Sequence, residues 1–232
     1  MEKTGWSEII CDSALVFIDD ERLIEKLKNN PARFFREMSL YMKLAIPRFN
    51  RPPEVIAHLA DQTPPQFGDY LWKSEGSDGA ATIETGMTGY ELCNVSLQGT
   101  DRYRNPIETP VAAEYNSETG AVTIPGPIGA GAEYDMDFYT DGYFLRPISG
   151  EMKRILGLCV QVVWENRFSS AWLPRASKVT DKSFVAPNEA NWTRAQEEKR
   201  RSAEATLNEE LRQYEQNRNY MNTVGGVKRT LL

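Results

Sequence analysis

The sequence predicts an α+β protein in which a helical bundle with a long C-terminal helix carries an inserted antiparallel β domain. Apolar residues recur about every 3.6 residues in segments 34–45 and 152–163, as in helices that bury one face. Between them, segments 109–115 and 134–138 alternate at period two, as in half-buried strands. Because the helices before and after the β segment need each other's apolar faces, we expect the β segment to be an insertion.

The expected organisation is a discontinuous bundle, a β domain and a flexible arm. Segment 63–86 is rich in Pro, Gly, Ser and Asp, which indicates a loop before the β domain. The predicted bounds are 1–62 and 149–221 for the bundle, 86–146 for the β domain, and 222–232 for the arm.

Capping residues and prolines delimit the predicted helices. Asp19 and Asp20 can cap a helix that ends just before Pro31, and Pro31 suits the first position of the next helix. Pro47 ends that second helix. Ser149 is the expected N-cap of the most apolar segment, which we place at the centre of the core.

The last predicted helix begins near Asn188 and extends to about Met221, which is roughly 50 Å at 1.5 Å per residue. Its apolar stripe is narrow and its other faces are densely charged. Burial alone cannot hold such a helix, so we expect it to project into solvent or to lie beside a partner.

Composition limits the function classes. The net charge is −6 and the sequence pI is about 5.1, so the chain has no overall attraction for DNA phosphates or anionic lipid. Cys11, Cys93 and Cys159 form no CxxC pair, and an odd count argues against a disulfide framework. We expect synthesis in a reducing cytoplasm, with no membrane span.

No catalytic or metal-binding pattern emerges, so we expect neither enzyme activity nor a cofactor. The single histidine, His58, has no evident triad or zinc partners. The loop between Gly126 and Gly131 lacks the Lys and the following helix of a phosphate-binding loop. Segment 135–142 fails the calcium-loop pattern, because Tyr139 occupies a ligand position.

Acidic residues on the predicted strands could pair as in glycosidases, although nothing in the sequence pairs them. These residues are Glu91, Glu108, Glu114, Asp135 and Asp137. The only dense basic cluster in the sequence lies on the last helix, where flanking glutamates at three- and four-residue spacing will mostly neutralise it. Nucleic-acid binding there is an alternative to a solvated or subunit-facing charged surface.

The last helix is the best candidate for a subunit interface, since aromatic anchors and charges line it. The candidate interface residues are Trp192, Lys199, Arg200, Arg201, Leu207, Leu211 and Tyr214. The tail beyond it carries a glycine hinge and an apolar tip, which suits an arm that orders on docking. The candidate arm residues are Thr223, Val224, Gly225, Gly226, Val227, Lys228, Arg229, Thr230, Leu231 and Leu232.

Five short phrases together resemble a structural protein from the neck of tailed bacteriophages, over roughly residues 40 to 215. They are 45–50 (AIPRFN), 88–93 (TGYELC), 137–142 (DFYTDG), 164–168 (WENRF) and 187–194 (PNEANWTR). The organisation is also similar to that of head–tail adaptor proteins, which combine a helical bundle, a long helix, a β region and a C-terminal arm. The β segment here is larger than in the simplest adaptors.

The resemblance implies a ring, commonly of twelve copies, that lies below the portal protein and inserts its C-terminal arm into the portal. It would place residues 223–232 in that arm and the β segment against tail proteins, neck proteins or neighbouring copies. The expected function is therefore a virion head–tail connector, with DNA only as passing cargo. The alternatives are another phage tail or baseplate subunit, or a ligand-binding module with a carbohydrate-binding β domain.

Overall fold

The structure is a computed structural model that describes the backbone of residues 3–171 and 188–229, and the side chains of residues 3–167 and 194–219. It confirms the α+β class, with a long C-terminal helix and antiparallel sheets. The chain divides into two compact units. The helical unit comprises Met1–Asp19, Ser39–Thr63 and Tyr143–Leu232, and the β unit comprises Asp20–Met38 and Pro64–Gly142.

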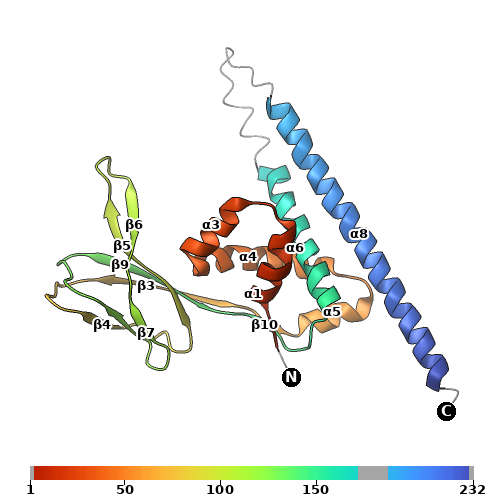
Figure 1. The fold of residues 1–232 in the computed structure, drawn as a ribbon, viewed down its shortest axis with the longest axis horizontal. Helices are drawn as coiled ribbons and strands as arrows, with labels where there is room; N and C mark the ends of the chain where they lie inside the picture. Colours follow the sequence, from red (N-terminus) through yellow and green to blue (C-terminus); the bar gives the residue numbers. More distant parts are fainter. Residues whose placement is uncertain (1–2, 172–187, 230–232) are drawn as a thin grey trace. The chain divides into compact units, whose positions relative to one another are not determined.

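Most of the helical unit consists of helices drawn from three separate parts of the chain (Figure 1). They are α1 (Trp6–Ile9), the π-helix η1 (Ile10–Ala14), α2 (Leu15–Phe17), the end of α4 (Pro31–Ala45), the 3-10 helix η2 (Ile46–Arg48), α5 (Pro53–Ala60), α6 (Gly150–Ala171) and α8 (Asn188–Arg229). A small antiparallel sheet of order β1-β10-β2 joins strands Thr4–Gly5, Tyr143–Phe144 and Gln62–Thr63.

Helix α6 forms the centre of the helical unit. The Ser149 hydroxyl accepts a hydrogen bond from the Met152 amide at 3.2 Å, which confirms the predicted N-cap. Close packing against η1 requires a glycine at position 157, because a Cβ atom there would lie 2.8 Å from the carbonyl carbon of Ser13. The described apolar side chains of α6 that are buried are Met152, Ile155, Leu156, Leu158, Cys159, Val160, Val162, Val163 and Trp164.

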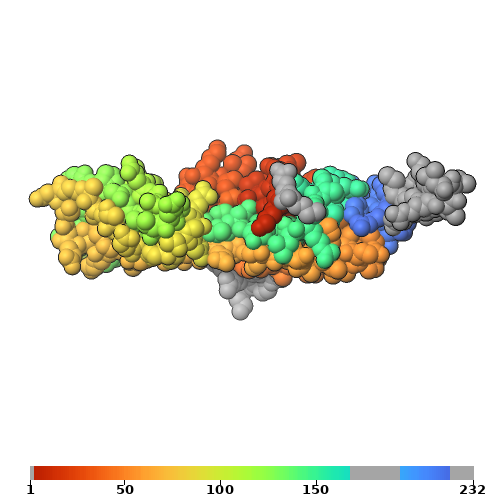
Figure 2. All heavy atoms as spheres, turned by 90° about the horizontal axis from the view of Figure 1, so that it is seen from below, coloured from red at the N-terminus to blue at the C-terminus, as the bar shows by residue number. Residues whose placement is uncertain are grey.

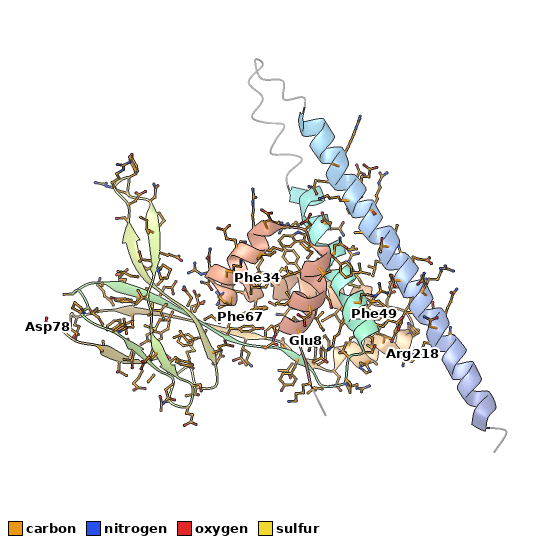
Figure 3. The ribbon with its side chains drawn as sticks, in the orientation of Figure 1. Glu8, Phe34, Phe49, Phe67, Asp78 and Arg218 are labelled. Atoms are coloured by element: carbon orange, nitrogen blue, oxygen red, sulfur yellow. The ribbon has the colours of Figure 1, made fainter. Side chains whose placement is uncertain are left out.

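Helix α8 runs alongside α6 within the same unit (Figure 1). The space-filling view shows the surface of residues 39–63 (orange) beside α6 (teal) and α8 (blue) (Figure 2). Phe49 points toward α8, where its ring meets Tyr214 edge-on at 5.4 Å between centroids (Figure 3). Segments far apart in the sequence therefore share one helical core.

The β unit contains two antiparallel sheets together with α3 (Glu21–Asn29) and the first part of α4. Asp20 caps α3 by accepting a hydrogen bond from the Arg22 amide at 3.1 Å, and α4 begins at Pro31 as predicted. One sheet has the order β3 (Gln66–Lys73), β9 (Glu133–Thr140), β5 (Glu91–Thr100) and β6 (Pro106–Pro110). The other has the order β4 (Ala81–Glu84), β8 (Ala121–Ile124) and β7 (Glu114–Asn116).

A single apolar cluster forms the core of the β unit. As predicted, Tyr134, Met136 and Phe138 alternate along β9 and point into this core. Residues of both sheets and of the segment between β8 and β9 complete it, namely Ile83, Val95, Val122, Ile124 and Ile128. The β5–β6 hairpin extends beyond the other strands of its sheet (Figure 1).

The unit boundaries differ from the predicted domains in two ways. Asp20–Met38 belongs to the β unit rather than to the bundle, because Arg33 and Arg36 form ion pairs with strand carboxylates. Tyr143–Phe144 belongs to the helical unit, because β10 pairs with β1 and β2. Long-range pairing of this kind leaves no local signal in the sequence.

Two predictions about strands were wrong. The predicted loop 63–86 contains strands β3 and β4, whose polar and glycine residues resemble those of a loop. The predicted strand 109–115 is divided between β6 and β7, which lie in different sheets. Alternation indicates a strand, but it does not indicate which sheet the strand joins.

Helix α8 begins at Asn188 as predicted but continues to Arg229, so the predicted end near Met221 was wrong. Glycine costs only about 1 kcal/mol in a helix relative to alanine, so the Gly225–Gly226 pair does not have to end one. The arm is therefore helical from Thr223 to Arg229, while its side chains and residues 230–232 lie outside the described part of the chain.

Candidate interaction surfaces

The seam between α6 and α8 explains the apolar stripe of the long helix. Ala203, Leu207, Leu211 and Tyr214 recur every three or four residues and are all buried within the chain. The prediction that Leu207, Leu211 and Tyr214 contact another subunit was therefore wrong. Their apolar surface is covered by the chain's own helical unit, a neighbour too distant in sequence to be anticipated.

An ion pair adds to this seam. The Arg154 guanidinium donates two hydrogen bonds to the Glu210 carboxylate, one of them to Oε1 at 2.7 Å. The hydrogen bond from Arg154 lowers the pKa of Glu210, since it favours the ionised carboxylate. This pair orients α8 on α6, but partly exposed pairs contribute little stability.

The predicted basic cluster spreads over more than one face of α8: Lys199 and Arg200 precede buried Ala203 by one helical turn, whereas Arg201 points away from it. Arg201 is exposed and pairs with Glu197 at 2.8 Å, while Arg200 is partly buried. Lys199 is exposed and lines a groove of about 700 Å³ with residues of α2 and α6, including Phe17 and Gln161. These three residues stay candidates for a subunit interface, whereas the Trp192 side chain lies outside the described residues.

Further along α8, the exposed charges are largely paired within the helix. Arg212 donates to both carboxylate oxygens of Glu209, at 2.8 and 3.1 Å. Hydrogen bonds from Arg212 and then from Gln213 lower the pKa of Glu209 to about 2. The exposed face therefore stays charged over a wide pH range.

The structure adds a second basic cluster that the sequence did not reveal. Arg48 and Arg51 come from the segment around η2, and Arg212 comes from α8. Together with Asn50 and Glu209 they line a groove of about 490 Å³. Three arginines against one glutamate give this groove a net positive lining.

In the β unit, the structure brings together three carboxylates that the sequence could not pair. Arg33 of α4 contacts Glu108 at 2.9 Å, Asp135 at 2.9 Å and Asp137 at 3.5 Å. Asp137 is almost fully buried and also accepts a hydrogen bond from Asn30 at 2.7 Å. Arg33 therefore ties α4 to strands β6 and β9.

The electrostatics of this cluster fit a structural role. Burial raises the pKa of Asp135, and the charge of Asp137 adds to the rise, while Arg33 opposes it. The hydrogen bond from Arg36 lowers the pKa of Asp69 nearby. Arg33 offsets one of the three negative charges and holds all three carboxylates by ion pairs, so the contacts anchor the start of α4 to the sheet.

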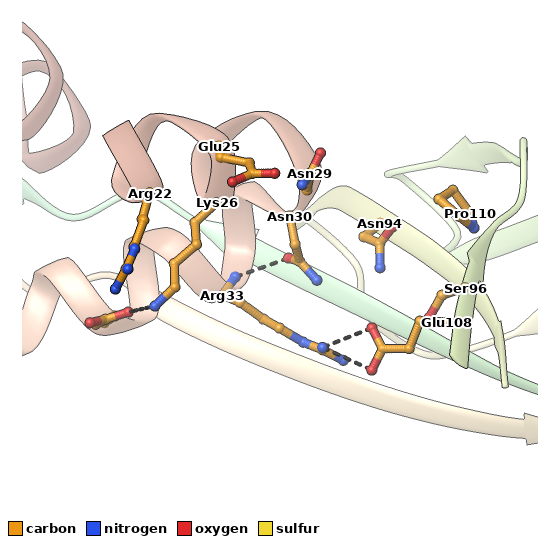
Figure 4. Close-up of a pocket in the computed structure, with 11 residues that line it drawn as sticks. Arg22, Glu25, Lys26, Asn29, Asn30, Arg33, Asn94, Ser96, Glu108 and Pro110 are labelled. Carbon is orange, nitrogen blue, oxygen red and sulfur yellow. Dashed lines mark hydrogen bonds and ion pairs between the residues drawn. The ribbon is translucent and has the colours of Figure 1, made fainter. Parts of the chain in front are cut away.

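A groove of about 870 Å³ lies beside Arg33, between α3, α4 and the β5–β6 strands (Figure 4). Its lining is balanced in charge, so it favours neither a phosphate nor a cation. The ionisable residues that line it are Arg22, Lys26 and Arg33 on the basic side and Glu25, Glu37 and Glu108 on the acidic side. Lys26 and Glu37 already pair at 2.6 Å.

The remaining sequence candidates have structural roles. The His58 ring lies 2.9 Å from the Pro147 carbonyl oxygen, within the helical unit. The glycine-rich loop packs so closely that a Cβ atom on Gly126 would lie 2.1 Å from the Gly79 oxygen. The described residues contain no cluster of His, Cys, Asp and Glu side chains placed to hold a metal ion.

No helix among the described residues is long and apolar enough to cross a membrane. Comparisons of the chain with protein-family models, with curated proteins and with solved structures gave no match. The case for a function therefore depends on the surfaces described above and on the sequence resemblance.

Proposed function

We propose that this chain is a structural subunit of a tailed-phage neck, a head–tail connector that forms a ring between portal and tail and bounds the DNA channel. The observation that carries the proposal is the length of α8 relative to the helix it packs on. Helix α8 has 42 residues and α6 has 22, which correspond to about 63 and 33 Å. Helix α6 can therefore flank only about half of α8.

An uncovered helix of this length requires other contacts. Most helical stability in proteins comes from tertiary packing, and the buried apolar residues of α8 already pack within the helical unit. A ring provides such contacts, because the charged face of each α8 would lie against a neighbouring copy. Many weak contacts of this kind add together once a ring closes.

The exposed pairs on α8 suit this arrangement. Glu197 with Arg201, and Glu209 with Arg212, place both signs of charge on the exposed side of the helix. Residues of opposite sign can exchange partners between adjacent copies. The net charge of −6 would keep passing DNA from adhering to the ring.

In this proposal, residues 223–232 dock the ring onto the portal as an extension of α8. The test is to mix purified protein with the portal of the same particle and to count bound copies by electron microscopy. Deletion of 223–232 should abolish docking while the circular dichroism spectrum keeps the helical unit's signal. A matched control replaces the same segment by a shuffled sequence of equal composition, which should also fail to dock.

Two further variants test the ring contacts separately from docking. Arg201→Glu should weaken ring closure on the portal, since it places a carboxylate beside Glu197 and removes a cation from the interface. Lys28→Gln, at an exposed position of α3 in the β unit, serves as the control and should assemble normally. Mass spectrometry of purified virions should detect this polypeptide. Its absence from them would exclude the connector function.

The alternatives gain less support. A tail or baseplate subunit would use the same surfaces. Electron microscopy of virions in which this polypeptide is labelled distinguishes a position in the neck from one in the tail or baseplate. A carbohydrate-binding module needs aromatic side chains on an exposed strand face. Among the described side chains, Tyr103 is the only strongly exposed aromatic residue, and it lies at the tip of the β5–β6 hairpin.

A further inference from the structure

The two edges of the four-stranded sheet differ in their ability to pair with another strand. Strands β6 and β3 are the terminal strands in the order β3-β9-β5-β6. A terminal strand presents a row of backbone N–H and C=O groups, which can bind another strand unless something blocks it. The sequence of each edge shows whether it is blocked.

Prolines block the β6 edge. The Val111 amide donates to the Val95 oxygen at 2.8 Å, and antiparallel strands bond at every second residue. Residues 107 and 109 therefore face β5, while Pro106, Glu108 and Pro110 face outward. Since proline has no N–H, only Glu108 could donate to a strand added at this edge.

The β3 edge carries no such block. The Ser74 amide donates to the Ala132 oxygen at 2.8 Å, in register with β9, so alternate residues back to Gly68 face β9. Phe67, Asp69, Leu71 and Lys73 then direct their backbone groups outward, and each of them can donate. Leu71 is 65% exposed, which is unusual for a leucine in the middle of a strand.

We propose that β3 pairs antiparallel with β3 of a second copy of this chain, in the register that places Leu71 opposite Leu71 of the partner copy. In this register, the residues whose backbone N–H and C=O groups point away from β9 lie opposite the same kind of residue in the partner copy, so their backbone groups can form hydrogen bonds. It also places Asp69 opposite Lys73 of the partner copy, twice by symmetry. Each such pair can exchange two backbone hydrogen bonds and brings opposite charges together.

Charge decides between this register and its neighbours. A shift of two residues in either direction places Leu71 opposite Asp69 or Lys73, so the charges lose their partners. Charged residues on an edge strand normally discourage pairing. Here the two charges have opposite signs and lie symmetrically about Leu71, so they favour a second copy over an unrelated strand.

The side chains fit the same arrangement. The side chains of Leu71, Asp69 and Lys73 lie on one face of the sheet. Asp69 is held in place by an ion pair with Arg36 at 2.5 Å. Lys73 is held by an ion pair with Glu133 at 3.2 Å. Tyr70 and Trp72 lie on the other face, packed partly into the core. In the proposed register Tyr70 is opposite Trp72 of the partner copy, an aromatic pair of the kind that stabilises sheets.

The proposal goes beyond the connector function and does not depend on it. A two-fold β3 contact joins only two copies, whereas a ring around one axis uses head-to-tail contacts between different surfaces. The pair would therefore form between free subunits or between two rings. Tests on the isolated full chain, without a portal, address it separately.

Cross-linking tests the register directly. Paired Cα atoms in this position lie about 5.5 Å apart, within the range that a disulfide spans. Leu71→Cys should form a covalent dimer at least about tenfold faster than Ile107→Cys, which places an exposed thiol on the blocked edge. Both variants carry Cys11→Ser, and burial raises the pKa of Cys93 and of Cys159 to about 12, so the remaining native thiols should add little background.

Sedimentation of the full chain over a range of concentrations tests the pairing without a cross-link. The natural sequence should show a monomer–dimer equilibrium, and Leu71→Pro should raise its dissociation constant at least about tenfold by removing an outward N–H group. Leu71→Thr keeps that group and is the matched control. Monomers at every concentration, or equal cross-linking of Leu71→Cys and Ile107→Cys, would overturn the proposal.

Discussion

Helices α6 and α8 lie side by side in the helical unit, yet they are stabilised in different ways. Helix α6 buries apolar side chains around much of its circumference, because η1, α1 and α8 all contact it. The described part of α8 buries only a stripe of four residues. The difference indicates that α6 is a core element, whereas α8 is a core element on one side and an exposed surface on the other.

The largest effect is expected in α6. Leu156→Ala should lower the free energy of unfolding by about 3 to 5 kcal/mol, because the cavity it leaves is enclosed on several sides. Urea denaturation of the full chain, followed by tryptophan fluorescence, measures this loss. Leu44→Ala is the control, since Leu44 is exposed and its truncation should change stability by no more than about 0.5 kcal/mol.

A smaller loss is expected from the same change in α8. Leu207→Ala should lower the free energy of unfolding by about 2 to 3 kcal/mol, because solvent and neighbouring side chains can partly fill the space from the open side. The same denaturation experiment compares the two helices. An equal loss at both positions would mean that α8 is buried as deeply as α6, contrary to the comparison.

Acid should weaken the seam between the two helices. Arg154 lowers the folded-state pKa of Glu210, so the pair stabilises the fold above the usual glutamate pKa of about 4.3. This contribution should be lost as the pH falls through the lower folded-state pKa. Glu210→Gln should cost about 1 kcal/mol or less at pH 7 and should make stability less dependent on pH below 4.3. Thermal melts from pH 7 to 2 would measure both effects; an unchanged pH dependence would contradict this role.

The smallest effect is expected on the exposed face of α8. Arg212→Ala should leave the free energy of unfolding nearly unchanged in urea denaturation, because Arg212 and Glu209 are both solvent-exposed. If the connector proposal is correct, the same variant should nevertheless reduce assembly on the portal. A large loss of stability would instead show that this face is part of the fold.

The sequence predicted those features that depend on neighbouring residues. Asp20, Pro31 and Ser149 each begin a helix at the expected place, and Tyr134, Met136 and Phe138 alternate into the β core as expected. Caps and periodicity are local, so they can be read without knowledge of the fold. The end of α8 was misplaced because glycines only weaken a helix.

The candidate surfaces were less predictable from sequence. Leu207 and Tyr214 were expected at a subunit interface but are covered by α6 and Phe49 of the same chain. Arg33 gave no signal, although it gathers three carboxylates from β6 and β9. The predicted loop 63–86 contains β3, whose open edge is now the basis for a proposed contact.

By itself, the sequence determined the α+β class, the starts of the main helices, the alternation of β9 and the charged character of α8. Tertiary structure decided which apolar residues of α8 are already buried, which strands share a sheet and which sheet edge is open. The physical reason is that capping and periodicity act between residues close in the chain. Burial, ion pairing and strand order depend on residues that folding alone brings together.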